Sequence, residues 1–329
     1  MSKRSLRIGT RKSAMALAQT EEVARLLRAT APKVDVQIVT FETRGDQDHI
    51  SRLLRHGGKG GAFVAEIRQA MLDGELHAAM HSLKDLPGNE ETPGLVIAAA
   101  LPRDASNDSL VLRRGLTIDK FRASHGKGFK IGTNAVRRAA YLARLFPEAT
   151  VIHFRGAADT RIRKLDRGEV QQLADGGIVG PADALVMARS GLQRVGLASR
   201  IAYDFSVDEM LPAVGQGIVA VECAERDWST RACLAMIEGE GARLCAEAER
   251  ELLWVLNGHC NSPIAGHAML SGGEMELMAA VLEQDGSNFI EARRIGTVDR
   301  PRELGRMVAF DLLEKGAANV IARTRPEEP

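Results

Sequence analysis

The sequence predicts an α/β fold of two similar lobes followed by a smaller α+β domain. Three observations indicate it: strand and helix patterns alternate through the N-terminal third, one short motif at a strand–helix junction occurs twice, and the pattern changes after residue 241. A chain of 329 residues is also long for a single hydrophobic core, because domains of about 100–200 residues are usual.

In the N-terminal third, segments with the hydrophobic spacing of strands alternate with segments that have the spacing of helices. Residues 6–9 and 96–101 are short apolar runs that predict strands, and residues 34–38 alternate apolar with polar side chains, as a half-buried strand does. Residues 23–27 and 63–71 carry apolar side chains at helical spacing. This order of elements indicates a sheet with helices on its faces.

A weak internal repeat suggests that this unit occurs twice. Arg7-Ile8-Gly9-Thr10 and Lys130-Ile131-Gly132-Thr133 each end a predicted strand and open a predicted helix near arginines. A helix N-terminus offers unpaired N–H groups and positive dipole charge, so each junction suits an anion. The repeat predicts two α/β domains facing each other across a cleft, although four similar residues can also arise by chance.

The C-terminal third has a different pattern. Residues 244–256 show helical spacing with an apolar side, residues 275–282 form a further apolar run, and residues 301–315 predict a final helix. This order favours an α+β domain. Residues 168–181, rich in Gly, Gln and Asp, predict a surface loop.

Composition limits the choice of partners and compartment. The net charge is +1, no apolar run approaches the length of a membrane span, and the N-terminus shows no signal peptide. We therefore expect a cytoplasmic protein without nucleic-acid or membrane partners. The four cysteines form no CxxC pair and match no zinc spacing, so reduced thiols are expected.

Arginines near predicted element ends form the first candidate site. Because the guanidinium group binds carboxylates through a planar fork of donors, clustered arginines suit a substrate with several acid groups. Ordinary solvated surface charges are the alternative. The residues concerned are Arg11, Arg137, Arg138, Arg155, Arg161 and Arg194.

The segment His81-Ser82-Leu83-Lys84-Asp85 is the second candidate. A carboxylate beside Lys and Ser at a strand end suits acid–base work or stabilisation of a cation, and a surface Lys–Asp pair is the alternative. His77 and His81 are four residues apart, but the stretch reads as a strand and no Glu completes HExxH. We therefore predict no metal site.

Two further segments carry possible chemistry. Gly57-Gly58-Lys59-Gly60-Gly61 lacks the Lys-Ser/Thr ending of a phosphate-binding loop and suggests either a hinged lid with one cation or a plain turn. Cys260 lies in a polar loop beside His259, so for this cysteine a reactive thiol is as well supported as a structural one. Cys223, Cys233 and Cys245 are expected to be small buried hydrophobes.

Taken together and in order, these segments resemble the porphobilinogen deaminase (hydroxymethylbilane synthase) family across nearly the whole chain. The matching motifs are Arg7-Ile8-Gly9-Thr10-Arg11, Thr43-Arg44-Gly45-Asp46, Gly57-Gly58-Lys59-Gly60, His81-Ser82-Leu83-Lys84-Asp85, Val136-Arg137-Arg138, Arg155-Gly156 with Thr160-Arg161, Leu211-Pro212-Ala213-Val214-Gly215-Gln216-Gly217, Glu249-Arg250, Gly258-His259-Cys260 and Pro263-Ile264-Ala265.

The resemblance implies a three-domain architecture. Two lobes like those of type II periplasmic binding proteins would comprise residues 1–102 with 217–235, and residues 106–212. A lid loop would span residues 46–61 of the first lobe. A third α+β domain, residues 240–329, would carry Cys260.

The resemblance also implies the activity. Such transferases condense four porphobilinogens head to tail, release four ammonia molecules and yield hydroxymethylbilane for tetrapyrrole and haem biosynthesis. A dipyrromethane cofactor would be bound to Cys260 through a thioether. We expect a cytoplasmic monomer whose partner is the small molecule porphobilinogen.

Site roles follow from the same resemblance. Asp85 would stabilise the cationic azafulvene left when ammonia departs, assisted by Arg11 and Lys84, and the lid would include Gly57, Gly58, Gly60 and Phe63. Cofactor contacts are assigned to Ser13, Asp46, Lys59, Ser82, Thr133, Arg137, Arg138, Arg155, Gly156, Arg161 and Arg194.

The sequence departs from the family pattern at four places. Thr133-Asn134-Ala135 replaces Thr-Ser-Ser, Ala157 replaces Asn, His259 replaces Gly, and residues 168–183 are about a dozen residues longer than usual. Ala135 and Ala157 remove polar groups, at a cost of about 0.5–1.5 kcal/mol for each neutral hydrogen bond. Three hypotheses result: an active divergent enzyme, a paralogue with altered pyrrole chemistry, or a two-lobed anion-binding protein without catalysis.

Overall fold

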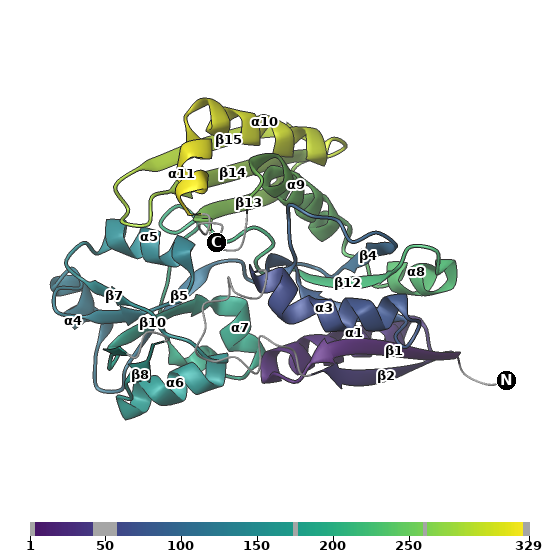
Figure 1. Cartoon of the computed structure of the whole chain (residues 1–329), viewed down its shortest axis with the longest axis horizontal. Coiled ribbons are helices and arrows are strands. Elements are labelled where there is room, and N and C mark those ends of the chain that lie inside the picture. The colour runs from purple at the N-terminus through teal and green to yellow at the C-terminus, as the bar shows by residue number, and fades with distance from the viewer. Residues whose placement is uncertain (1–3, 42–57, 174–176, 259–261, 325–329) are drawn as a thin grey trace.

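The computed structural model describes residues 4–41, 58–173, 177–258 and 262–324. In this part of the chain, two five-stranded sheets form two lobes that lie side by side, and a three-stranded sheet belongs to a third domain above them in the view of Figure 1. The predicted fold class, two α/β lobes with a smaller α+β domain, is confirmed. No helix of the described residues is long and apolar enough to cross a membrane.

The first lobe has the strand order β2-β1-β3-β12-β4. Strands β1, β2 and β3 are parallel, and β12 is antiparallel to both of its neighbours. The strand β12 follows the second lobe in sequence, so the chain returns to complete the first sheet. The elements are β1 (Arg4–Arg11), α1 (Ala14–Thr30), β2 (Val34–Phe41), α3 (Gly58–Leu72), β3 (Ala78–Ser82), the 3-10 turn η2 (Leu83–Asp85), β4 (Leu95–Ala100), β12 (Val219–Ala224) and α8 (Trp228–Ala235).

The second lobe has the order β11-β5-β10-β6-β7. Here β6, β7 and β10 are parallel, and β5 is antiparallel to β10 and β11. The elements are β5 (Asp108–Leu112), α4 (Ile118–Ala123), β6 (Lys130–Gly132), α5 (Val136–Leu145), β7 (Thr150–Ile152), α6 (Ala158–Arg167), β8 (Gln171–Gln172), β9 (Ile178–Val179), β10 (Ala184–Ala188), α7 (Arg189–Arg194), η3 (Ala198–Arg200) and β11 (Ile201–Asp204).

The two sheets repeat one topology. Read from β7, the second sheet is β7-β6-β10-β5-β11, which matches β2-β1-β3-β12-β4 strand for strand and direction for direction. In each sheet, the antiparallel strand, β12 or β5, is the first strand after the chain crosses from the other lobe. Gly9 and Gly132 hold equivalent places, and a Cβ at either would overlap a leucine side chain, Leu76 or Leu185.

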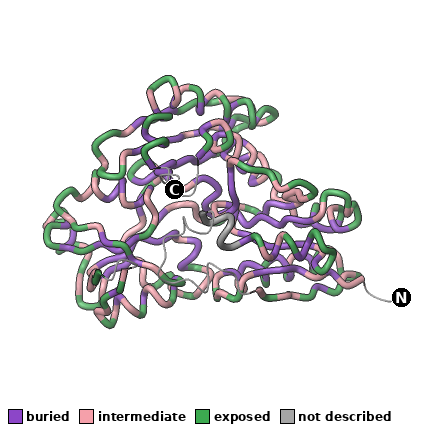
Figure 2. The backbone as a smooth tube through the Cα atoms, in the orientation of Figure 1, coloured by how far each residue is buried: buried purple, intermediate pink, exposed green. Residues whose placement is uncertain are grey.

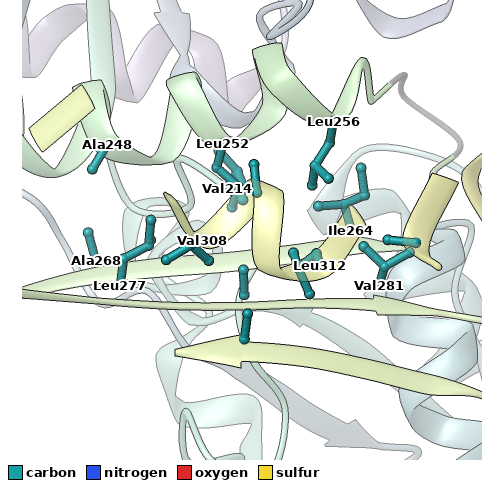
Figure 3. Packing of buried hydrophobic residues seen from close by; sticks show 14 of the residues in the cluster. Val214, Ala248, Leu252, Leu256, Ile264, Ala268, Leu277, Val281, Val308 and Leu312 are labelled. Carbon is teal, nitrogen blue, oxygen red and sulfur yellow. The ribbon is translucent and has the colours of Figure 1, made fainter. Parts of the chain in front are cut away.

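The third domain packs its helices against a three-stranded sheet. Leu252 and Leu256 on α9 meet Val308 and Leu312 on α10 above the strands, as Figure 3 shows, and all four are buried. Figure 2 shows buried segments following the strands through all three units, as expected when apolar faces drive folding. The elements are α9 (Glu240–Leu256), β13 (Ile264–Ser271), β14 (Glu274–Leu282), β15 (Phe289–Thr297), α10 (Pro301–Glu314) and α11 (Ala317–Arg323).

Two segments differ from the expected loops. The helix α3 begins at Gly58, so the expected lid loop 46–61 ends earlier than predicted. Glycine disfavours helix, but burial of Val64 and Ile67 along the same helix favours it. Within residues 168–181, β8 and β9 pair as a short hairpin, with Gln171 opposite Val179. Strands of two residues are too short to give a periodic hydrophobic signal.

One buried glutamate joins all three units. Residues 101–107 and 205–218 connect the lobes, and Glu249 on α9 contacts both connections. Its carboxylate accepts hydrogen bonds from Arg103 Nη1 at 2.6 Å, from Gly215 N at 2.6 Å and from Ala268 N at 2.7 Å. Glu249 is 0% exposed, so these bonds are made out of water. Through Glu249, the third domain therefore binds both segments that connect the lobes.

We predict that Glu249→Leu lowers the free energy of unfolding by about 3–5 kcal/mol, because it leaves the Arg103 charge and two N–H groups buried without their partner. Urea denaturation measures the change. Glu247→Leu on the same helix is the matched control, since Glu247 pairs with Arg302 at 3.7 Å near solvent, and such a pair contributes only about 0–1 kcal/mol. Equal losses of stability in the two variants would contradict this role of Glu249.

Candidate functional site

A cavity of about 60 Å³ lies where the lobes meet. Its wall takes residues from α1, β3 and η2 of the first lobe, from α5, α6, β10 and α7 of the second, and from the connection at 215–218. Met15 of α1 packs against Gly191 of α7, where a Cβ would come within 2.8 Å of the Met15 Cε. The polar wall residues are Gln19, Ser82, Lys84, Arg138, Arg161, Ser190 and Arg194.

Cations line the wall, and two of them pair with acids set behind it, Arg138 with Asp108 and Arg194 with Asp104. Lys84, Arg138, Arg161 and Arg194 line it, and no Asp or Glu is among the wall residues that the structure describes. Such a surface raises the local concentration of anions and suits a ligand with several carboxylates. Of the arginines predicted for the site, three therefore come together at one cavity.

Arg161 is the wall residue whose surroundings most favour binding of an anion. Its Nε is buried and has no hydrogen-bond partner among the described residues. Burial, followed by the positive charge of Arg138, lowers the pKa of Arg161 to about 10. Both causes disfavour the charged form of the guanidinium group. The negative charge of a bound carboxylate would raise the pKa again. Ala157, the N-cap of α6, makes no side-chain cap bond at this helix end.

Arg137 and Arg138 share a buried acid that the sequence analysis missed. Asp108 is 0% exposed. Its carboxylate accepts a hydrogen bond from Arg138 Nη2 at 2.8 Å and forms an ion pair with Arg137. Burial raises the pKa of Asp108, but the two guanidinium groups more than offset it and hold the pKa well below its usual range. Arg137 also donates to Leu211 O at 2.7 Å and does not reach the cavity wall.

Glutamine side chains extend this network to both lobes. Gln216 Nε2 donates to Asp108 Oδ1 at 2.9 Å, and Gln216 Oε1 accepts from Lys84 Nζ at 3.1 Å. Across the cavity, Gln19 Nε2 donates to Ser82 Oγ at 2.9 Å. The sequence contains a signal for Gln19, because it falls on the apolar face of α1 with Ala16 and Val23.

Arg194, the last residue of α7, is the fourth cation of the wall. It forms an ion pair with Asp104, which lies in the connection between the lobes. Burial lowers the pKa of Arg194, and Asp104 opposes that shift. The pairing ties α7 to the connection and leaves Arg194 at the cavity surface.

Other predicted residues lie at the same sheet edges but outside the cavity wall. In the first lobe, Arg11 ends β1, Ser13 caps α1 by accepting from Ala16 N at 3.3 Å, and Asp85 ends η2. Because β1 and β3 are parallel neighbours, their carboxyl ends share one edge. In the second lobe, Thr133 follows β6, and Arg155 and Gly156 precede α6.

Several predicted residues cannot be placed. Asp46, Gly57 and Cys260 lie outside the described residues, as do the side chains of Lys59 and Phe63 and the surroundings of Gly58 and Gly60. The segment before Cys260 is placed, however. Asn257 Oδ1 accepts from Asn89 Nδ2 at 3.1 Å, and Gly88 packs against Leu253. The end of α9 therefore contacts the segment that follows Asp85.

These features define a class of protein: a two-lobed α/β fold whose lobes enclose a cationic site for a small molecule with several acid groups. The chain belongs to the porphobilinogen deaminase family. The family model of the dipyromethane cofactor binding domain matches residues 6–232, and that of the C-terminal domain matches residues 243–314. The predicted family, its transferase activity and its dipyrromethane cofactor are confirmed.

Relatives match along the full length. The porphobilinogen deaminase of Xanthomonas campestris pv. campestris is 39% identical over 318 residues, covering 97% of this chain and 99% of the relative. Porphobilinogen deaminase 2 of Streptomyces coelicolor is 40% identical, covering 96% of each chain. Among solved structures, the methionine binding protein MetQ matches with 13% identity and a TM-score of 0.39, covering 71% of this chain and 89% of MetQ.

Proposed function

We propose that this chain condenses four porphobilinogens head to tail to hydroxymethylbilane, releasing four ammonia molecules, with the cavity between the lobes as its pyrrole site. The observation that carries the proposal is the wall of four cations without a described acid, in which the Arg161 Nε has no partner. Porphobilinogen bears an acetate and a propionate, so a growing chain of pyrroles brings several carboxylates to this wall.

Arg138, Arg161 and Arg194 are assigned to those carboxylates. Each hydrogen bond to a charged group contributes roughly 1.5–3 kcal/mol net. Arg138 already shares the charge of Asp108 with Arg137, so Arg161 is the strongest anion ligand of the three. Lys84, held by Gln216, and Ser82, held by Gln19, complete the site from the first lobe.

Asp85 is assigned to the chemical step. Departure of ammonia from porphobilinogen leaves a positively charged pyrrole, and a carboxylate beside its N–H stabilises that charge where it develops. Asp85 is half-buried on the same 3-10 turn as the wall residue Lys84. Arg11, at the neighbouring strand end, is assigned to binding a carboxylate nearby.

The residues fit the dipyrromethane cofactor. Among the described residues, the Arg161 Nε has no partner and the wall contains no acid, which suits the carboxylates of the cofactor. The α9 end that leads to Cys260 contacts the segment after Asp85. When bound, the cofactor supplies the pyrrole end to which new units are joined. We assign its thioether to Cys260, and its further contacts to Ser13, Asp46, Lys59, Thr133, Arg155 and Gly156.

Monomer and cytoplasm remain part of the proposal. We assign a monomer because the wall residues that the structure describes come from both lobes of this one chain. Three cysteines, Cys223, Cys233 and Cys245, are buried free thiols, as is usual in a reducing compartment.

The proposal is tested with Arg161→Leu. Wild-type protein given porphobilinogen should release one ammonia per porphobilinogen consumed and form a linear tetrapyrrole. We expect Arg161→Leu to raise the KM for porphobilinogen about 10- to 100-fold, because one charged carboxylate contact is lost. Arg163→Leu, an exposed position on the same helix, should leave KM within about twofold. Absence of tetrapyrrole from the wild type would favour the altered paralogue or the binding protein instead.

A further inference from the structure

A side chain from the long segment 168–183 contacts the turn that leads into α6. Gln171 Oε1 accepts a hydrogen bond from Arg155 N at 3.1 Å, although the two residues belong to different elements. Gln171 is 9% exposed, whereas its neighbour Gln172 is exposed, so β8 directs one glutamine inward and the other outward. The pairing of Gln171 with Val179 on β9 fixes this choice.

The turn has an unusual backbone conformation and an alanine at its helix cap. Gly156 has φ of +127°, a conformation that side chains rarely adopt. Ala157, the N-cap of α6, has no side-chain oxygen to satisfy the helix N–H groups. The Gln171 oxygen accepts from Arg155 N, two residues before this cap, and so fixes the backbone that leads into the helix from outside the turn.

The same turn contacts Arg161. Arg161 N donates to Ala157 O at 2.9 Å, so the turn is bonded to the backbone of that arginine. A Cβ at Gly156 would lie 3.7 Å from Arg161 Cγ, so the turn also runs close to its stem. Since the Arg161 guanidinium lines the cavity with its Nε unpartnered, its direction depends on this stem. A continuous series of contacts runs from Gln171 through the turn to Arg161.

We propose that Gln171 is a positioning residue for the pyrrole site: through the Arg155 N–H it holds the turn before α6 and thereby orients Arg161 toward substrate and cofactor carboxylates. The inference rests on the proposed function. It gives the β8–β9 hairpin a role in the site without direct contact with the ligand. Gln171 is absent from the cavity wall, in agreement with an action through Arg161.

The test compares three variants of the full chain. Gln171→Leu removes the acceptor, Gln171→Glu keeps an oxygen that can accept from the Arg155 N–H, and Gln172→Leu changes the exposed neighbour. We expect Gln171→Leu to raise the KM for porphobilinogen about three- to tenfold, as loss of one neutral hydrogen bond does, with kcat within about twofold. Gln171→Glu should restore KM to near the wild-type value, and Gln172→Leu should leave it unchanged.

A readout independent of turnover accompanies the kinetics. Cofactor-free protein incubated with porphobilinogen should gain the mass of two pyrrole units more slowly in Gln171→Leu than in wild type, and the Glu variant should recover the rate. Melting temperatures identify a variant that fails by unfolding. A wild type without activity contradicts the proposed function, whereas an active wild type with Gln171→Leu unchanged, or with Gln171→Glu equally impaired, overturns the positioning role alone.

Discussion

Asp85→Asn lowers kcat for porphobilinogen about 100- to 1000-fold in our account, the range seen when one preorganised electrostatic group is removed from a transition state. Asparagine keeps the shape of the side chain but not its charge. The pyrrole that loses ammonia is positively charged, and the neutral amide cannot stabilise it. Substrate carboxylates still meet the cations of the second lobe, so KM should change much less than kcat. Ammonia release at saturating porphobilinogen measures the effect.

The control for this prediction is Asp208→Asn. Asp208 is exposed and lies outside the cavity wall, so its neutralisation should not alter turnover. An Asp85→Asn enzyme that turns over as fast as the parent would show that another group stabilises the cation, and Asp85 would then be only the end of the 3-10 turn.

Cys260→Ala should abolish turnover, a loss of at least about 1000-fold, because without the thiol the cofactor has no covalent attachment. The other cysteines are poor substitutes. Burial raises the pKa of the Cys223 and Cys245 thiols to about 11 and also raises that of Cys233. At neutral pH these thiols remain protonated, and the thiolate is the nucleophile.

Cys233→Ala is the matched control for that variant. Cys233 is buried in the core of the first lobe, and its replacement should lower stability slightly without affecting the rate per folded molecule. Full turnover by Cys260→Ala would assign the cofactor to a different attachment.

The architecture was predictable from sequence because it depends on local patterns. The Ile-Gly-Thr repeat indicated two equivalent strand–helix junctions, and Gly9 and Gly132 do occupy equivalent places in two sheets of one topology. Hydrophobic period also indicated the amphipathic helix of the third domain, whose Leu252 and Leu256 pack on α10. Such signals survive because burial requires them at fixed spacing.

The site was only partly predictable, because its side chains are organised by contacts distant in sequence. The sequence predicted the arginines but not their different partners. Arg137 and Arg138 share Asp108, about 30 residues away, whereas the Arg161 Nε has no partner in the described part of the chain. A sequence pattern names a cation but not the acid that neutralises it. Gln171 was missed for the same reason, since its only signal was an unusually long segment.

Intact mass of the purified protein, with and without Cys260→Ala, tests the central claim most directly. The account predicts that protein from cells able to make porphobilinogen exceeds its sequence mass by two pyrrole units, and that the excess disappears in the variant. An unmodified wild-type mass would contradict the account, and would indicate that the changes at Ala135, Ala157 and His259 have cost the chain its cofactor.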